Sequence, residues 1–391
     1  MKHKRPFGAD RRPHVALLIE TSLASGRDIL RGIARYAREH ERWALYHEPH
    51  GLTDSTPSWI RRWGGDGIIA RVQTRTTAIE LLASGIPVVD VLGVVPGVPF
   101  PLVHVDNRAI GQLAAEHLLE RGIQNFGFFG VKGENWSEER YAGFAAAVGR
   151  VQKQIALCEL PRGAMDRRSW ERIENKLAEW VRALPRPAGI FVCSDQRGAP
   201  MLEACRRAGV HVPDEVAVIG VDDDEALCEV CDPPLSSIQA DHVSVGYQAA
   251  SLLDTLLRRG HVSETPHPIS PRNVVSRRST DTLATGDQSV TAALRFIRER
   301  ASPDVSVDTI AAHCGLSRSA LQRRFQKVLD RSIHQEIILD KIKRARELLT
   351  KTDLPLAIVA ERAGFKHQEY MGAVFKTRLK TTPGRIRAAS P

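Results

Sequence analysis

The sequence predicts an α/β protein of two lobes, followed by an all-α domain with two helix-turn-helix motifs. From Pro13 to about Arg277, short apolar strands alternate with amphipathic helices, a pattern typical of parallel sheets covered on both faces. This region of about 265 residues is large for one such sheet, which favours two lobes. After residue 288 only helical patterns remain, and one short stretch there occurs twice.

The strands and helices of the first region follow from the periodicity of their apolar residues. Strands are expected at 14–20, 43–48, 66–71, 86–93, 102–106, 126–130, 155–160, 189–195 and 216–223. Helices are expected at 26–39, 107–121, 138–149, 170–183, 196–208 and 242–259. Ligands of such sheets bind beyond the carboxyl ends of the strands, so we expect a crevice between the two lobes.

A linker joins the first region to the helical one. Residues 278–290, RSTDTLATGDQSV, are small and polar and interrupt the alternation of strands and helices. We therefore divide the chain into an N-terminal tail (1–12), a two-lobed domain (13–279), a linker (280–288) and a helical domain (289–391). Helices of the last domain are expected at 289–300, 306–313, 317–328, 333–351, 355–362 and 367–379.

The composition argues against a membrane or secreted protein. No apolar run approaches the ~20 residues of a membrane span. The basic N-terminal stretch has about six apolar residues before Glu20 and lacks the cleavage site of a signal peptide. The six cysteines are scattered, which favours structural thiols in the cytoplasm. Cys228 and Cys231 form a single CxxC without a second pair, so we expect no metal and no cofactor.

The net positive charge of the chain is confined to its last quarter. From residue 287 onward there are 20 Lys and Arg against 11 Asp and Glu, whereas the rest of the chain has 35 of each. A basic domain beside a neutral one indicates a polyanionic partner for the basic domain alone.

The first copy of the repeated stretch has the parts of a helix-turn-helix motif. Ile310 and Ala311 face inward, Gly315 turns the chain in a left-handed conformation, Leu316 enters the core, and Ser317 caps the next helix. That helix is expected to bury Leu321, Phe325 and Val328. Its outer face carries side chains that reach base edges and phosphates, namely Arg318, Ser319, Gln322 and Arg323.

The second copy repeats this arrangement 49 residues later. Ile358 and Val359 are expected to be buried, Gly364 to turn the chain and Phe365 to fill the turn. The expected outer residues are Lys366, His367, Gln368, Glu369 and Ala373. A helix of about 20 residues between the copies is a rod of roughly 30 Å, close to the ~34 Å between successive major-groove faces. Two helix-turn-helix motifs joined by this helix can therefore enter the major groove at adjacent turns of the same DNA.

The helical segment resembles the AraC-type DNA-binding domain from about residue 288 to 388. The twin turns, KIKRARELL at 341–349 and FKTRLKTTPGRIR at 375–387 carry this resemblance. The family usually has Gly before TTP and Tyr before the last Arg, where this chain has Leu379-Lys380 and Ile386. The resemblance implies binding to double-stranded operator DNA.

The two-lobed region resembles the effector-binding core of LacI/GalR-type regulators, which has a periplasmic-binding-protein-like fold. The resemblance lies in VHVDNRAIGQLAAEHLLERGIQNFGFFG (103–130), ERYAGFAAAV (139–148) and FVCSDQRGAPMLEACRRAGVHVPDEVAVIGVDDDE (191–225). Those regulators carry their DNA-binding helices at the N-terminus, and here about 12 residues precede the first strand. A LacI-like core followed by an AraC-type domain resembles the bacterial xylose-operon regulators.

Candidate effector contacts lie at strand ends and at the start of helices. Asp195 and Asp222 each end a strand, and sugar sites need carboxylates and Arg as strong hydrogen-bond partners. Arg140 matches the sugar-contacting Arg of the LacI/GalR family, and Trp136 precedes it by one helical turn. Arg27 is expected on the same rim, which we expect to be solvated. Asp222 alternatively caps a helix, and Trp136 alternatively packs within one lobe.

The three carboxylates of GVDDDE (220–225) alternatively suggest a metal site for phosphoryl transfer, but the chain has no GxxxxGK[ST] loop. No triad of catalytic residues is placed by motif, so we expect no enzyme. The sequence instead predicts a cytoplasmic transcription activator controlled by a pentose such as xylose. It is expected to act as a homodimer, with RNA polymerase as a further candidate partner. The alternative is a carbohydrate-binding or sugar-modifying protein whose basic domain only docks to a partner.

Overall fold

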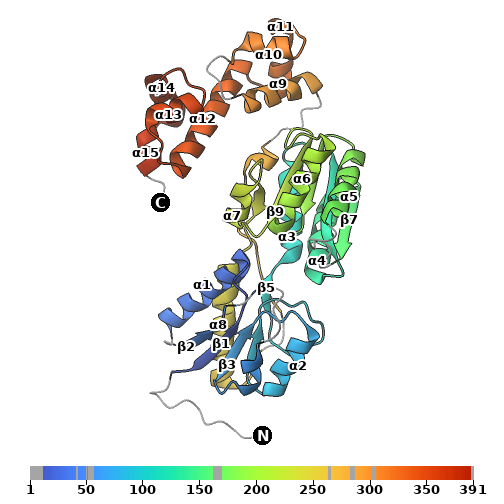
Figure 1. Ribbon diagram of the computed structural model, residues 1–391, viewed down its shortest axis with the longest axis vertical. Helices are drawn as coiled ribbons and strands as arrows, with labels where there is room; N and C mark the ends of the chain where they lie inside the picture. The colour runs from blue at the N-terminus through green and yellow to red at the C-terminus, as the bar shows by residue number, and fades with distance from the viewer. Residues whose placement is uncertain are drawn as a thin grey trace. The chain divides into compact units, whose positions relative to one another are not determined.

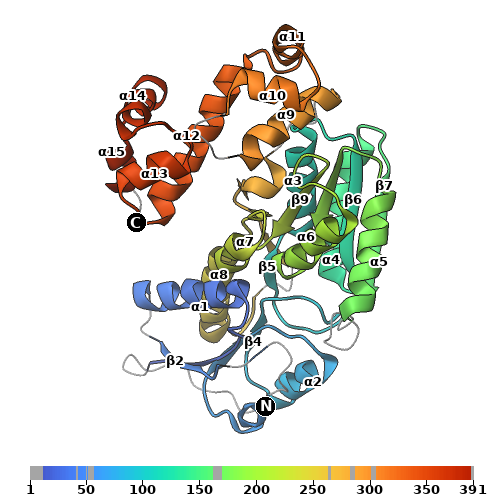
Figure 2. The ribbon, with the colours of Figure 1, turned by 45° about the horizontal axis from the view of Figure 1, so that its top comes forward.

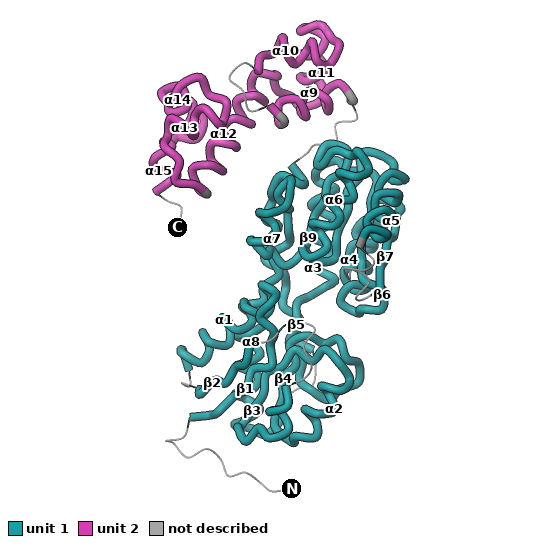
Figure 3. Tube along the Cα trace, viewed as in Figure 1, with its two compact units in different colours: residues 1–282 teal, residues 283–391 magenta. Residues whose placement is uncertain are grey.

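A computed structural model describes residues 12–40, 43–49, 51, 57–161, 170–262, 266–281, 287–300 and 305–388. The chain divides into two compact units, Met1–Thr282 and Leu283–Pro391 (Figure 3). Most of the tail (1–12) and of the linker (280–288) lies outside the described residues. No helix in the described ranges is long and apolar enough to cross a bilayer.

The first lobe of unit 1 is built on a parallel sheet with the strand order β2-β1-β3-β4. Its elements are β1 (His14–Leu18), α1 (Ala24–Glu39), β2 (Ala44–His47), the 3-10 helix η1 (Ser58–Arg62), β3 (Gly67–Ala70), α2 (Arg75–Ser84), β4 (Val88–Asp90) and α8 (His242–Arg259). The strands β1 and β3 are almost wholly apolar and buried, because helices cover the sheet (Figure 1).

The second lobe has a six-stranded sheet with the order β12-β10-β9-β8-β6-β7, in which only β12 runs antiparallel to its neighbour. It contains α3 (Asn107–Leu119), β6 (Asn125–Lys132), α4 (Asn135–Gly149), β7 (Ile155–Pro161), α5 (Trp170–Ala183), β8 (Ala188–Val192), η2 (Asp195–Arg197), α6 (Gly198–Ala208), β9 (Val216–Val221), α7 (Glu225–Val230), β10 (Ser236–Ile238), β12 (Val274–Val275) and η3 (Arg278–Thr280). The α/β alternation expected from the sequence is therefore confirmed.

Three segments connect the two lobes of unit 1. The chain crosses after β5 (Val103–Val105), again between β10 and α8, and a third time between β11 (His267–Ile269) and β12 (Figure 1). The strands β5 and β11 pair with each other in parallel. The crossovers thus lie side by side, at the place where the lobes meet.

In each lobe, two helices pack against each other at glycines. The pairs are α1 with α8 in the first lobe (Figures 1 and 2) and α3 with α4 in the second. A Cβ built on any of four glycines would lie 2.0 Å from a carbonyl oxygen of the partner helix; these are Gly32, Gly246, Gly111 and Gly143. A side chain at these positions would force the helices apart, so each pair is held at close backbone contact.

Unit 2 is helical in all its described parts and has two separate cores. Its helices are α9 (Gln288–Glu299), α10 (Val307–His313), α11 (Arg318–Leu329), α12 (Ile333–Lys351), α13 (Leu356–Arg362), α14 (Gln368–Leu379) and α15 (Pro383–Ala388). The first core joins α9, α10, α11 and the start of α12, and the second joins the rest of α12 with α13, α14 and α15. The helix α12 has 19 residues and is about 28 Å long.

The two repeated turns are confirmed as helix-turn-helix motifs. Gly315 and Gly364 have φ of 63° and 84°, in the left-handed region that favours glycine. The side chain of Ser317 caps α11 by accepting a hydrogen bond from the backbone of Ala320. One expectation was wrong, because Ile358 is 36% exposed while its neighbour Val359 is fully buried. Adjacent residues of a helix differ by about 100°, so only one of the pair can face the core.

Candidate effector pocket and DNA-binding face

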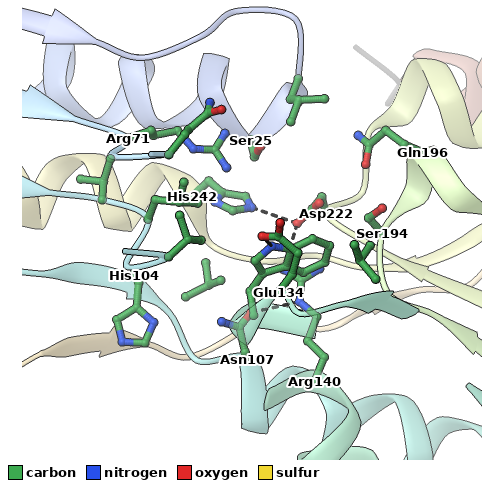
Figure 4. A pocket seen from close by; sticks show the side chains of 18 of the residues that line it. Ser25, Arg71, His104, Asn107, Glu134, Arg140, Ser194, Gln196, Asp222 and His242 are labelled. Atoms are coloured by element: carbon green, nitrogen blue, oxygen red, sulfur yellow. Dashed lines mark hydrogen bonds and ion pairs between the residues drawn. The ribbon is translucent and has the colours of Figure 1, made fainter. Parts of the chain in front are cut away.

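A cavity of about 670 Å³ lies between the two lobes of unit 1. Polar side chains reach it from both lobes (Figure 4), among them Ser25, Arg71, Gln73, His104, Asn107, Glu134, Arg140, Ser194, Gln196, Arg197, Asp222 and His242. The remaining wall is largely apolar, with leucines, valines and the ring of Trp136. The cavity therefore combines many hydrogen-bonding groups with apolar surface, which suits a small polar organic ligand.

Arg140 is the central side chain of the second lobe's wall. It projects from α4, is 5% exposed, and its Nε donates a hydrogen bond to Oδ1 of Asn107 at 3.0 Å. Its Nη1 donates to the carbonyl of Cys193, and its Nη2 lies 3.6 Å from Oδ1 of Asp222. The guanidinium also lies 5.2 Å from the ring centroid of Trp136. These contacts fix the orientation of the Arg140 guanidinium, so the group is already in position at the cavity before a ligand binds.

Asp222 follows β9 and faces the cavity from the end of the strand. Its Oδ1 lies 3.1 Å from Nε2 of His242, which begins α8 in the first lobe. Burial opposes ionisation of Asp222, but the charge of Arg140 and the hydrogen bond with His242 outweigh burial and hold its pKa well below the usual value. The cavity thus contains a permanent carboxylate that is shared between the two lobes.

Trp136 lies beside Arg140, as expected for residues one helical turn apart. Its indole nitrogen donates a hydrogen bond to Oε2 of Glu134 at 3.0 Å, and both side chains line the cavity. The structure therefore places three of the five predicted effector residues at the cavity: Arg140, Asp222 and Trp136.

Asp195 lies behind the cavity wall, and the expectation of a solvated rim was wrong for it. Its carboxylate is 1% exposed and accepts hydrogen bonds from the backbone nitrogen of Asp224 at 2.9 Å and the hydroxyl of Ser237 at 2.7 Å. A Cβ on Gly220 would lie 2.2 Å from its Oδ1, so glycine at 220 makes room for the carboxyl. Asp195 thus holds together the loops behind the cavity.

Arg27 is also absent from the residues that line the cavity. Its Nη1 donates to the carbonyl oxygens of Thr21 and Ser22, at 2.8 Å and 3.2 Å, and its Nη2 lies 3.9 Å from Asp224 of the second lobe. The guanidinium is thus bound at the entrance to α1 and pairs weakly across the gap between the lobes.

The first lobe contributes cavity residues that the sequence motifs did not single out. Arg71 follows β3 and forms an ion pair with Glu20, which follows β1 and is fully buried. Among the described residues, Oε2 of Glu20 and Nε of Arg71 have no hydrogen-bond partner. Arg71 lines the cavity, so its guanidinium can bind a polar ligand there, whereas Glu20 lies behind the wall and pairs with it. The strand ends that carry both residues were the only signal in the sequence.

Replacing Asp195 by Asn is expected to flatten the pH dependence of stability. Burial, and secondarily the charge of Asp222, raises the pKa of Asp195 to about 8. The native state then keeps a proton that the unfolded chain loses above about pH 4. The contribution of Asp195 to the free energy of unfolding is therefore fully present below pH 4 and is lost as the pH rises through 8. One pKa unit corresponds to about 1.4 kcal/mol, so the wild type should lose at least that much more unfolding free energy than D195N between pH 5 and pH 8.5. Urea titrations at both pH values measure this, and parallel losses would contradict it.

The described residues contain no group of three or more His, Cys, Asp or Glu side chains arranged to hold a metal ion. The CxxC residues Cys228 and Cys231 are buried free thiols. The thiol of Cys228 lies 3.5 Å from Oδ2 of Asp195, and burial raises the pKa of Cys228 far above its usual value. These cysteines pack in the core of the second lobe.

The predicted DNA-contacting side chains all lie on the surface of unit 2. The exposed residues are Arg318, Ser319, Gln322 and Arg323 of α11, with Lys366 and His367 before α14 and Gln368, Glu369 and Ala373 in it. Arg318 pairs with Asp308 at 3.2 Å, but both side chains are more than half exposed, so the pair costs little to break. Both helices therefore present polar residues to solvent and apolar residues to their own cores.

Comparisons with known proteins cover the chain from end to end. A periplasmic binding protein-like domain matches residues 115–280, and a helix-turn-helix domain matches residues 310–389. The xylose operon regulatory protein of Haemophilus influenzae is 32% identical over 383 residues, which cover 95% of this chain and 97% of that protein. That of Escherichia coli K12 is 30% identical over 387 residues, covering 96% and 97%.

A solved structure, described as that of the xylose-binding transcription activator xylR, matches with a TM-score of 0.81 and 28% identity, covering 97% of this chain and 99% of that one. The fold class and the family expected from the sequence motifs are thereby confirmed. Because the relatives match over nearly their whole length, this chain belongs to the family of the xylose operon regulatory proteins, which are transcription regulators.

Proposed function

We propose that this regulator is an activator whose cavity binds xylose or a related pentose, and whose unit 2 binds operator DNA. The single observation that carries the sugar assignment is the neutral, hydrogen-bonding character of the cavity. The charged side chains that line it are Arg71, Arg140 and Arg197 with the carboxylates of Glu134 and Asp222. Arg71 is also paired with the buried Glu20 behind the wall, so three guanidinium groups are balanced by three carboxylates. An anion would meet two carboxylates, whereas the hydroxyls of a sugar can both donate to carboxylates and accept from guanidinium groups.

The proposed sugar contacts differ in part from those expected from the sequence. Arg140, Asp222 and Trp136 remain proposed contacts. The guanidinium of Arg140 and the carboxylate of Asp222 would bind sugar hydroxyl groups, and the indole of Trp136 would pack against the C–H face of the sugar ring. Asn107, Arg71 and His242 are added, because they line the cavity and come from both lobes. Asp195 is assigned a positioning role and Arg27 a place outside the cavity.

For unit 2 we propose that α11 and α14 enter the major groove of operator DNA. Support comes from their exposed polar faces and from the excess of Lys and Arg after residue 287. The nine side chains predicted from the sequence remain the proposed contacts. With α12 about 28 Å long, one chain would contact two successive major-groove faces.

Further parts of the proposal rest on the role of the family. A regulator of transcription works where the chromosome is, so we place it in the cytoplasm. We expect a homodimer on two half-sites, RNA polymerase as a further partner, and no catalysed reaction. Analytical ultracentrifugation with and without operator DNA tests the dimer.

The function is tested by measuring sugar binding with and without DNA. Isothermal calorimetry should detect xylose binding to the full-length protein, and saturation with an operator duplex should change the xylose Kd. A typical coupling is about 5–150-fold, and operator affinity must change by the same factor when xylose is added. Glucose-6-phosphate serves as an anionic control that should not bind. Identical xylose affinities with and without operator would refute the sugar-controlled function.

A further inference from the structure

Three consecutive aspartates after β9 contact three different parts of unit 1. Asp222 lines the cavity and pairs with Arg140 and His242. Asp224 precedes α7 and lies 3.9 Å from Arg27 of the first lobe. Asp223, between them, turns away from the cavity and pairs with Arg277. The loop 222–224 is therefore in contact with the ligand site, the opposite lobe and the C-terminal end of unit 1.

The pair of Asp223 and Arg277 is buried and well formed. Nη2 of Arg277 lies 2.8 Å from Oδ1 of Asp223, and the two side chains are 10% and 12% exposed. Nε of Arg277 also donates to Oε1 of Glu229 at 3.0 Å, and its Nη1 to the carbonyl of Leu235 at 3.1 Å. A guanidinium held at three points transmits a displacement of any one partner to the others.

Arg277 lies in the segment that leads out of unit 1, which ends at Thr282. The backbone nitrogen and carbonyl of Arg277 both hydrogen-bond the hydroxyl of Ser236, at 2.8 Å and 3.0 Å. The same hydroxyl accepts from Thr280, whose carbonyl accepts from Nε of Arg121. The turn η3 is therefore bound to the second lobe by polar contacts that include Arg277.

The backbone of the loop depends on these side-chain contacts. Asp222 and Asp223 have φ of 101° and 51°, a region that non-glycine residues seldom adopt. Such a conformation persists only where the surroundings hold it. Here the partners of the three carboxylates act together with hydrogen bonds from the backbone nitrogens of the loop to Ile238, Ser237 and Asp195. A ligand that takes over hydrogen bonds of Asp222 therefore changes the forces on its neighbour Asp223.

We propose that the pair of Asp223 and Arg277 couples the cavity to the segment that leads to the DNA-binding unit. This inference rests on the proposed function, in which a sugar occupies the cavity and unit 2 binds DNA. Asp223 and Arg277 contact neither ligand. Their role is to make the position of residues 276–280 depend on the state of Asp222.

The test compares Asp223→Asn with Glu229→Gln in the full-length protein. Asn tolerates a left-handed backbone, so D223N removes the charge from the loop without adding strain. Glu229→Gln removes the other carboxylate of Arg277, which comes from α7 and not from the loop. Calorimetry with D-xylose is performed with and without a duplex that the full-length protein selects from random-sequence DNA.

In D223N the coupling factor, which is the ratio of the xylose Kd values with and without DNA, is expected to fall to within about twofold of one. The xylose Kd without DNA should change less than about threefold, and E229Q should keep a factor within about twofold of the wild type. Arg277→Lys, which retains the charge but cannot bond three partners at once, should also lose coupling.

Unchanged coupling in D223N and R277K overturns the inference and leaves the proposed function intact. An equal loss of coupling in E229Q and D223N also overturns the inference, because the contact of Arg277 with the loop would then matter no more than its contact with α7. A wild type whose xylose affinity does not respond to DNA overturns the inference and the proposed function together.

Discussion

Replacing both Arg318 and Arg323 by Ala is expected to abolish specific operator binding at ordinary salt concentration. Each long donor on the outer face of α11 should be worth about 1–3 kcal/mol if it contacts a base, so the two together should cost about 2–6 kcal/mol. If either contacts phosphate instead, the loss should be similar for all DNA sequences and the salt dependence should become shallower. Fluorescence anisotropy at several salt concentrations separates the two cases.

Arg324→Ala is the matched control, since it removes the same charge from the same helix. Its Nη1 lies 3.3 Å from Asp287, the N-cap of α9, so it faces the neighbouring helix within unit 2. Its loss should lower operator affinity far less than the double replacement. A double variant that binds operator as the wild type does would show that α11 is not a reading helix.

Arg140→Ala is expected to weaken xylose binding more than any other single change in the cavity. The variant loses a fork that is bonded to Asn107 and Cys193, and leaves Asp222 buried without its cationic neighbour. Breaking a buried pair typically costs about 3–5 kcal/mol, and a lost charged hydrogen bond about 1.5–3 kcal/mol. We expect a loss of at least about 100-fold in affinity, measured by calorimetry, together with a lower melting temperature of unit 1.

Two further variants make this result interpretable. Arg140→Lys retains the charge near Asp222 but loses the planar fork, so it should fold and still bind xylose at least about tenfold more weakly. Arg206→Ala removes an exposed Arg from the same lobe, where it pairs with Glu203 three residues away, and this variant should bind xylose normally. Normal xylose affinity in a folded R140K protein would mean that the cavity binds its ligand through other groups.

Much of the fold followed from periodicity, and the exceptions have physical causes. The helices at 170–183, 242–259 and 333–351 match their predicted bounds, because long amphipathic stretches repeat their pattern over several turns. The strands β10, β11 and β12 were missed because they have only two or three residues and, unlike the equally short β4 and β5, do not lie within longer apolar runs. The short helices α7 and α15, with six residues each, offer too few turns for a periodic pattern. The ten-residue helix α2 was also missed, because its apolar residues do not share one face: Leu81 is buried, but Ile79 and Leu82 are exposed.

The cavity was harder to predict than the fold, because its residues are joined only by the tertiary structure. Asp222 was predicted from its place at the end of a strand and Arg140 from a family motif, whereas Arg71, which also follows a strand, and His242 were not predicted. Asp195 shows the limit of an argument from strand ends. A carboxylate after a strand can turn toward the crevice or back against the next strand, and the sequence does not distinguish the two. Gly220, which makes room for it, was the one local hint.

The glycine contacts within the helix pairs determine how unit 1 can move. Helices in such close backbone contact resist sliding past each other, so we expect each lobe to move as a stiff body, with the remaining freedom in the three crossover segments. We expect the three adjacent crossover segments to permit opening and closing of the lobes but to resist twisting of one lobe against the other. The side chains of the two cavity walls would then take the same relative positions each time the lobes close. A site whose groups return to fixed positions can distinguish sugars that differ only in the direction of one hydroxyl group.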